Sequence, residues 1–230
     1  MLLILGGRND NDATVACPPD RLVELHLVVE SAFVKLYRYS IFSCTLNTPI
    51  RIPTKKIEAM SINARLDAEK RYDKIRTIAL EIAQGAISDQ FKLTKITSEA
   101  LSAAMLWENS KIRKYQWDWQ QNYSYYRISY PKRFEVALWE KSKLIAISLG
   151  RPTYNAIGLR LDVIEAMPRD LGQRSSVFDK IILSYEVYAR MLNASHIRIM
   201  NPVNDMVKAL YESYGYKYVA KGDYLSKEVL

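Results

Sequence analysis

The residues best suited to chemistry gather in one stretch of this chain, from Leu159 to Tyr216. Residues 167–176 read Met-Pro-Arg-Asp-Leu-Gly-Gln-Arg-Ser-Ser and stand directly before a segment with helical spacing. A helix N-terminus offers unpaired N–H groups and the positive end of the helix dipole. With Arg169 and Arg174 beside it, this loop is suited to hold phosphate. In the alternative interpretation, Ser175 or Ser176 caps the helix and the arginines are solvated.

The elements that must position this loop follow from the spacing of apolar residues. Residues 159–166 form an apolar, β-branched run of strand length, and apolar residues recur at helical spacing from Val177 to Leu192. Residues 196–201 then alternate as a strand does. Two strands joined by a crossover helix are most simply parallel neighbours, because parallel pairing needs a long connection. The stretch is therefore predicted to be a β-α-β unit.

A second motif lies in residues 201–216. Asn201 or Asn204 is placed to cap a short helix, an early proline suits its first turn, and Gly215 stands where a helix commonly ends. Here the sequence resembles the GNAT family of acyl-CoA N-acyltransferases. The run from Tyr211 to Tyr216 matches the family pattern Tyr-Glu-x-x-Gly-Phe/Tyr. Residues 169–174 fit the first four places of Gln/Arg-x-x-Gly-x-Gly/Ala and depart at the sixth, where Arg174 replaces a small residue.

The resemblance covers residues 91–229 and implies an α/β fold. That fold is a mixed, mostly antiparallel sheet flanked by helices, with a central β-α-β unit and splayed parallel strands. The expected order is strand, two helices, three strands, helix, strand, helix, two strands. The resemblance also implies acetyl-CoA as co-substrate, with N–H groups near Ile164, Glu165 and Ala166 pointing at the pantetheine arm. The remaining cofactor-binding residues that it implies are Arg169, Leu171, Gly172, Gln173, Arg174, Ser175, Asn201, Asn204 and Tyr211.

Acyl transfer from a thioester to an amine needs a base for the amine, a stabilised oxyanion and a proton for the leaving thiolate. By resemblance Tyr211 is the proton donor, since a phenol with a pKa of about 10 is neutral; alternatively it is a core aromatic. Asp162 and Glu165 lie three apart, so in regular pleating they face opposite sides of the strand. Glu165, nearer the strand end, is the predicted base. A salt bridge to Arg160 or a water-relayed proton path would leave it without that role.

Composition narrows the class of protein. The chain has 230 residues, of which 49% are hydrophobic and 25% charged, as in ordinary globular proteins. The apolar run at residues 1–5 is too short for a signal peptide or a membrane span, so a cytoplasmic protein without membrane contact is expected. The two cysteines, Cys17 and Cys44, have no ligand spacing with His26 or His196, so no metal is expected. The formal net charge of +8 favours an anionic partner, whether CoA, nucleic acid or protein.

Two parts of the chain are predicted to lie around this core. Residues 1–59 are interpreted as an N-terminal extension, and residues 60–230 as the GNAT-like domain, beginning with an amphipathic helix over residues 66–87. Thr97 or Ser98 is placed to cap a helix over residues 99–108. The aromatic run from Tyr115 to Tyr130 has two interpretations, a stacking platform for nucleic-acid bases or a second helix that walls the acceptor side of the cleft.

Two functions from different classes remain open at this point. The favoured one is an N-acetyltransferase that moves an acetyl group to a primary amine by direct attack in a ternary complex. Its acceptor is a small molecule, a peptide or an aminoacyl amine, and the protein is a monomer or homodimer. The alternative is a catalytically weak, basic protein of the same fold that contacts nucleic acid or a protein partner, which Arg174 at the sixth place of the loop motif supports.

Overall fold

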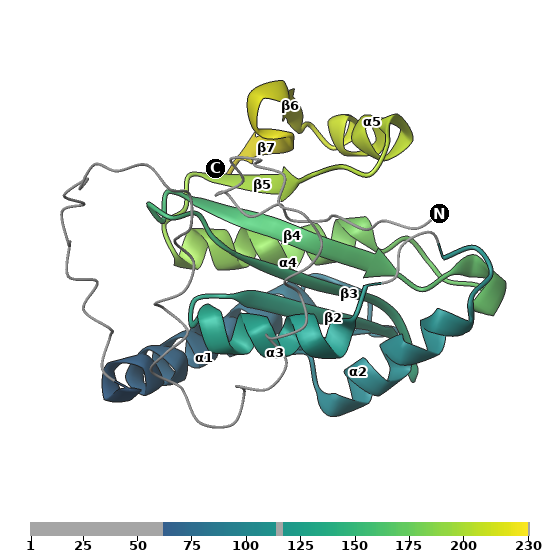
Figure 1. Cartoon of the computed structure of the whole chain (residues 1–230), viewed down its shortest axis with the longest axis horizontal. Helices are drawn as coiled ribbons and strands as arrows, with labels where there is room; N and C mark the ends of the chain where they lie inside the picture. Colours follow the sequence, from purple (N-terminus) through teal and green to yellow (C-terminus); the bar gives the residue numbers. More distant parts are fainter. Residues whose placement is uncertain (1–61, 114–116, 230) are drawn as a thin grey trace, which may run out of the picture. The chain divides into compact units, whose positions relative to one another are not determined.

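The computed structural model describes residues 62–113 and 117–229. The predicted extension at residues 1–59 and both cysteines lie outside these residues, so the domain boundary stays a prediction. Figure 1 shows the arrangement of the elements. The helices are α1 (Ile62–Gln84), α2 (Ser98–Met105), α3 (Trp119–Ser129), α4 (Phe178–Met191) and α5 (Asp205–Ser213), with short 3-10 turns η2 (Leu106–Asn109), η3 (Arg169–Leu171) and η4 (Ala220–Gly222). The strands are β1 (Phe91–Thr94), β2 (Phe134–Glu140), β3 (Lys143–Pro152), β4 (Gly158–Ala166), β5 (His196–Met200), β6 (Lys217–Val219) and β7 (Tyr224–Glu228).

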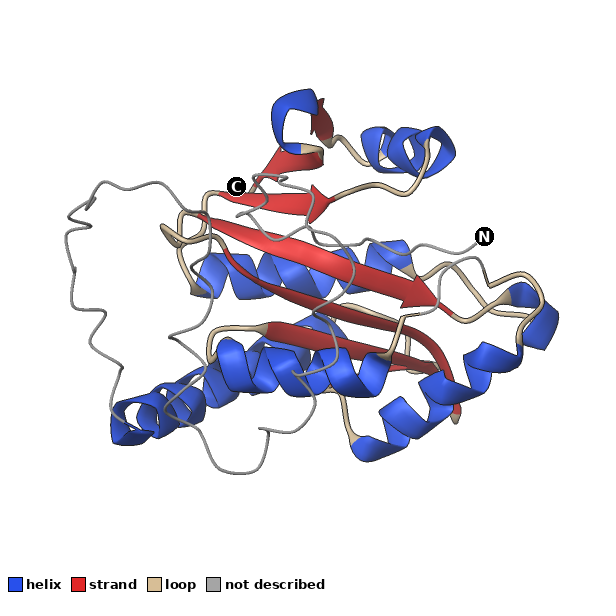
Figure 2. Ribbon diagram, viewed as in Figure 1, coloured by secondary structure: helices blue, strands red, loops and turns tan. Residues whose placement is uncertain are grey.

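These strands form one mixed sheet in the order β1-β2-β3-β4-β5-β7-β6 (Figure 2). Every neighbouring pair is antiparallel except β4 and β5, which are parallel and joined through α4. From β1 onward the element order is the one predicted from the motifs. The predicted fold class is therefore confirmed.

The parallel pair separates part of the way along its length. Strand β4 pairs with β5 only from Gly158 to Leu161, whereas its pairing with β3 continues to Ala166. Among the described residues, the edge of β4 from Asp162 to Ala166 therefore has no strand partner on the β5 side. This divergence confirms the expected splayed strands.

A β-bulge at Asp162 marks the point where the strands separate. Leu149 of β3 faces Val163, while Gly150 faces Leu161, so Asp162 is the extra residue. The side chains change phase there: Leu159, Leu161, Ile164 and Ala166 join one apolar cluster, and Val163 joins the other. The expectation that Asp162 and Glu165 face opposite sides is wrong, because a bulge lets adjacent residues point to the same face. Both carboxylates accept hydrogen bonds from α3.

Helices cover both faces of the sheet. One apolar cluster combines the sheet with side chains of α1, α4 and α5, and the other combines it with α2 and α3. Helix α1 is tied to the start of β2 by charge as well as by packing. Arg133 is bidentate to Glu69, at 2.8 Å from each guanidinium nitrogen, and donates to Glu135 at 2.7 Å. The fully buried Arg76 also donates to Glu69.

The structure of the helix ends shows which of the predicted caps are present. Thr97 caps α2 and Asn204 caps α5, each accepting a backbone N–H with its side chain. Gly215 follows α5 with a φ of 86°, the left-handed conformation expected of a terminal glycine. Helix α4 starts after Val177 and has no side-chain cap, so the interpretation of Ser175 or Ser176 as its cap is wrong. Ser175 instead donates its hydroxyl to Glu140 of β2.

Candidate active site

The loop after β4 carries the predicted phosphate-binding residues. It runs from Met167 to Val177, contains the single turn η3, and reverses at Gly172 with a φ of 136°, a conformation that favours glycine. Leu171 is half-buried and packs on the apolar cluster beneath α2 and α3, whereas Gln173 is exposed. The loop is therefore anchored at η3 and open to solvent on the far side of its glycine.

Positive charge gathers at this loop. Arg169 is exposed, and it makes no ion pair within the part of the chain that the structure describes. Arg174 donates Nε to the carbonyl oxygen of Met167 at 2.7 Å, and burial together with the charge of Arg169 lowers the pKa of its guanidinium. A third cation, Lys143, reaches the loop from the β2–β3 hairpin. Its Nζ lies so close to Gly172 that a Cβ atom at that position would collide with it. Cations held this close together indicate a place for an anion.

Two carboxylates also lie at this loop: Asp170 of η3, which accepts the Ser110 hydroxyl at 2.7 Å, and Glu140 of β2. The carboxylate of Glu140 accepts the Ser175 hydroxyl at 2.6 Å and its backbone N–H at 3.4 Å. The N-cap residue of α4, Val177, has no side chain that accepts from the first N–H groups of the helix. An anionic ligand could accept hydrogen bonds from the N–H groups at the start of α4. The N–H of the nearby Ser175 already donates to Glu140.

Glu165 lies near the end of β4 and is completely buried. Its carboxylate accepts Nε of Arg113 at 2.7 Å, Nη2 of Arg113 at 3.1 Å and Nε1 of Trp119 at 2.6 Å. Burial raises the pKa of Glu165, and the charge of Glu108 acts in the same direction, against the lowering by Arg113 and Trp119. The salt bridge considered for Glu165 exists with Arg113, whereas Arg160 pairs with Asp162.

Tyr211 lies on the other face of the sheet. Its ring is completely buried and packs on Phe178, the first residue of α4, with ring centroids 4.6 Å apart. Its hydroxyl is buried and has no hydrogen-bond partner among the described residues. Burial raises the pKa of Tyr211, so the phenol stays neutral. The fold brings Tyr211 beside the helix that follows the cationic loop, and it separates Tyr211 from Glu165 by the sheet.

The two asparagines have different surroundings. Asn204 caps α5 by accepting the backbone N–H of Val207 at 2.9 Å. Asn201 follows β5 with a φ of 45°, and its backbone N–H donates to the carbonyl oxygen of Asp223 at 2.8 Å. Asn201 therefore shapes the turn between β5 and α5 at the divergent end of the parallel strands.

Three residues of this site were missed in the sequence interpretation: Lys143, Arg113 and Trp119. Lys143 is the first residue of β3, and it reaches the loop only through the pairing of β3 with β4. Arg113 and Trp119 lie 52 and 46 positions from Glu165, and only the packing of α3 on the sheet brings them to it. The one available signal was the aromatic run, of which residues Trp119–Ser129 form α3 with buried side chains at Trp119, Tyr123 and Tyr126.

Residues 62–113 and 117–229 lack two kinds of feature. No group of three or more histidine, cysteine, aspartate or glutamate side chains there has the geometry to hold a metal ion. None of the helices in those ranges combines the length and apolar character that crossing a membrane requires.

Comparisons with known proteins found likeness in structure only. No family model and no curated protein sequence matches the chain. Among solved structures it is similar to the ribosomal-protein-S18-alanine N-acetyltransferase from Escherichia coli, with 13% identity over 60% of this chain and 94% of that one, at a TM-score of 0.45. Ard1 from Thermoplasma volcanium has 12% identity, with coverage of 61% and 99% and a TM-score of 0.46. An acetyltransferase from Streptococcus agalactiae has 12% identity, with coverage of 60% and 97% and a TM-score of 0.48.

At 12–13% identity these similarities concern the fold and do not show the activity or the substrate of this chain. The chain's own features decide the fold: the element order, the sheet order and the parallel strands that diverge at Asp162. On those features, the chain has a GNAT-type fold.

Proposed function

We propose that this protein is an N-acetyltransferase that moves an acetyl group from acetyl-CoA to a primary amine by direct attack in a ternary complex. One observation carries the proposal. Strand β4 leaves β5 at the Asp162 bulge, and the free strand edge leads directly into a loop that holds Arg169, Arg174 and, from β3, Lys143. An extended ligand with an anionic end fits a strand edge followed by cations, because the edge offers hydrogen bonds and the loop offers charge.

Acetyl-CoA has these two parts, an amide-containing arm and a diphosphate. Backbone groups of Ile164, Glu165 and Ala166 would pair with the arm and polarise the thioester carbonyl. Arg169, Lys143 and the start of α4 would hold the diphosphate, with Leu171, Gly172, Gln173 and Ser175 shaping the loop around it. Arg174 would hold the loop closed through its bond to the Met167 carbonyl as well as add charge.

Tyr211 is the proposed proton donor for the departing thiolate. Its hydroxyl is buried without a partner, and burial keeps it protonated, so its hydrogen-bonding capacity is unspent. An unsatisfied buried hydroxyl is costly to a fold. A ligand on this face of the sheet would supply the missing hydrogen-bond acceptor. Asn201 and Asn204 would fix the start of α5, from which Tyr211 projects.

Glu165 is proposed as the final acceptor of the amine proton rather than as a base in direct contact. Its carboxylate is fully buried and already accepts three hydrogen bonds, so an amine cannot reach it in this conformation. Burial raises its pKa, so the carboxylate takes up a proton more readily than an exposed glutamate does. The proton would arrive through a water relay, and Arg113 would hold the carboxylate in place meanwhile.

A second candidate is the catalytically weak binding protein of the same fold. Arg174 favours it, because its Nε is committed to a backbone carbonyl at the loop position where the family motif has a small residue. Such a protein would contact nucleic acid or a protein partner through its basic surface, and its complexes with nucleic acid would weaken steeply with salt.

One experiment separates the two candidates. Acetyl-CoA is titrated into the full chain by calorimetry, and transfer of a labelled acetyl group is then screened over small amines, peptides and aminoacyl-tRNA. Micromolar binding with transfer to at least one amine supports the enzyme. Absence of acetyl-CoA binding, with salt-sensitive binding of nucleic acid, supports the second candidate and contradicts the first.

A further inference from the structure

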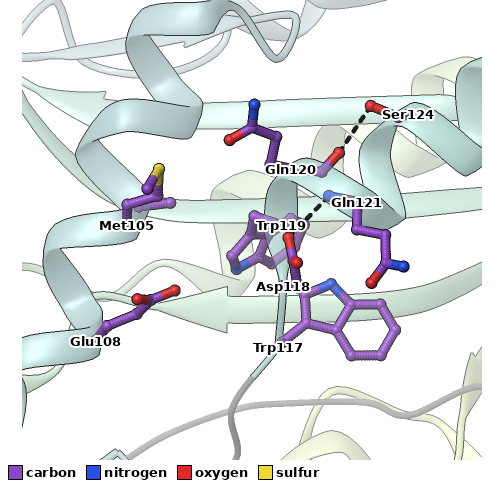
Figure 3. A pocket seen from close by; sticks show the side chains of 9 residues that line it. Met105, Glu108, Trp117, Asp118, Trp119, Gln120, Gln121 and Ser124 are labelled. Carbon is purple, nitrogen blue, oxygen red and sulfur yellow. Dashed lines mark hydrogen bonds between the residues drawn. The ribbon is translucent and has the colours of Figure 1, made fainter.

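A pocket of about 440 Å³ lies between the end of α2 and the start of α3. Figure 3 shows Met105 and Glu108 on one side of it, facing the segment from Trp117 to Ser124. The lining consists of Ala104, Met105, Glu108, Trp117, Asp118, Trp119, Gln120, Gln121 and Ser124. Its floor is fixed, because the indole of Trp119 is 3% exposed and is bonded to Glu165.

The charge of this pocket is opposite to that of the protein. The chain carries a formal charge of +8, yet the lining holds two carboxylates and no lysine or arginine. Within residues 62–113 and 117–229, neither Glu108 nor Asp118 forms a salt bridge with a basic side chain. One oxygen of Asp118 accepts the backbone N–H of Gln121 at 2.8 Å. Two carboxylates that pair with no basic side chain of the described residues, in a concave site, favour a cationic ligand.

The aromatic wall strengthens this preference. The rings of Trp117 and Trp119 pack edge to face, with centroids 6.3 Å apart and planes at 60°. Tryptophan faces attract ammonium groups and alkyl chains. The pocket thus offers a cation both negative charge and an aromatic wall.

We infer that this pocket receives a second positive charge on the acceptor, so that the preferred substrates are amines carrying another cationic group a few carbons from the reacting nitrogen. The inference rests on the proposed function, because it takes the other amine of the ligand to be the one that is acetylated. Trp119 links the two places, because it lines the pocket and donates to Glu165. The reacting amine must be neutral to attack a thioester, so carboxylates that hold a permanent cation serve recognition rather than chemistry.

The probe pair is 1,4-diaminobutane and 4-aminobutan-1-ol, which match in length and differ by one positive charge. Binding to the full chain is measured without acetyl-CoA, by calorimetry and tryptophan fluorescence at low salt. Exposed carboxylates contribute modestly, so we expect the diamine to bind about two- to fivefold tighter for each carboxylate. The preference should shrink as salt rises. Equal affinity for the two probes would overturn the inference.

Paired variants locate the effect. Glu108→Gln with Asp118→Asn should abolish the preference for the diamine while leaving the amino alcohol nearly unchanged. Asp89→Asn removes an exposed charge outside the pocket lining and should change neither. If the double variant keeps the preference, the pocket is not the cation site. If the preference holds but acetyl-CoA does not bind, the cation site stands and the proposed transferase function fails.

Discussion

Trp119 of α3 donates its indole N–H to the carboxylate of Glu165 at 2.6 Å, across the interface between helix and sheet. Seven positions further along the same helix, Tyr126 donates its hydroxyl to Asp162 at 2.9 Å. Helix α3 therefore donates hydrogen bonds to the carboxylates of both Glu165 and Asp162, which lie on the face of the sheet that α3 covers. Because β4 leaves β5 at this bulge, α3 helps to fix the geometry of the divergent strands.

The first prediction follows from that bond. Trp119→Phe keeps most of the ring and its packing but removes one donor from a buried carboxylate. Hydrogen bonds to charged groups are worth more than neutral ones, so we expect a loss of about 1.5–3 kcal/mol in the free energy of unfolding. Trp139→Phe is the matched control, because its indole donates at 3.0 Å to the neutral hydroxyl of Thr94. Denaturant unfolding of both variants should show the larger loss for Trp119→Phe; equal losses would show that the carboxylate adds nothing.

A second prediction concerns acid stability. Burial tends to raise the pKa of Glu69, but Arg133 and Arg76 outweigh it, so the pKa lies below the ordinary 4.5. A lowered pKa means that Glu69 adds stability above the unfolded value and loses it as the pH falls through the folded value. Melting temperature followed from neutral pH to below pH 4.5 should fall less steeply for Glu69→Gln than for the unaltered protein. Glu81→Gln, an exposed position on the same helix, should keep the original slope.

Sequence patterns predicted the features that depend on residues close together in the chain. The order of elements from β1 to β7, an asparagine cap before α5 at Asn201 or Asn204, and the glycine at 215 follow from periodicity and local motifs within a few residues. The facing of Asp162 and Glu165 was wrong, because one inserted residue in the pairing with β3 shifts the phase of β4. No property of residues 159–166 taken alone shows where β3 leaves a residue unpaired.

The candidate site was predictable in its contiguous part only. The loop from Arg169 to Ser175 could be found because its charges stand beside each other in the sequence. Lys143 and Arg113 reach the site through tertiary packing. The alternative interpretation, in which Ser175 or Ser176 caps α4, is wrong for the same reason, since Glu140 of a distant strand accepts the Ser175 hydroxyl.

A third prediction separates charge from loop structure in cofactor binding. Arg169→Ala and Lys143→Ala should each weaken CoA binding about three- to tenfold, because each removes an exposed cation that would meet phosphate. Pantetheine without phosphates should bind nearly as before. Arg174→Ala should weaken both ligands and lower the melting temperature, since Arg174 also donates to the Met167 carbonyl.

The control for this series is Lys92→Ala, which removes an exposed cation on the far edge strand β1. It should leave both affinities unchanged. Calorimetric titration of CoA and of pantetheine measures all four variants. A parallel loss for the two ligands in Arg169→Ala would contradict a phosphate contact at that residue.

The last prediction tests Tyr211. Tyr211→Phe keeps the ring that packs on Phe178 and removes a hydroxyl that has no partner among the described residues. The free energy of unfolding should therefore stay equal or rise slightly, because no internal hydrogen bond is lost. Tyr123→Phe is the contrast for stability, since its hydroxyl donates to the carbonyl oxygen of Ile96 at 2.9 Å and its loss should destabilise the fold.

The reaction rate of Tyr211→Phe should fall, although its stability should not. If Tyr211 protonates the leaving thiolate, its loss affects an interaction made only in the transition state, so kcat and kcat/KM should fall together, by about ten- to a thousandfold. Acetyl-CoA affinity should stay near that of the unaltered protein. Steady-state kinetics on an amine that the enzyme demonstrably acetylates, with calorimetric titration of acetyl-CoA, measures both. An unchanged kcat in a stable Tyr211→Phe variant would show that the hydroxyl has no part in the reaction and that Tyr211 serves only to pack α5 on α4.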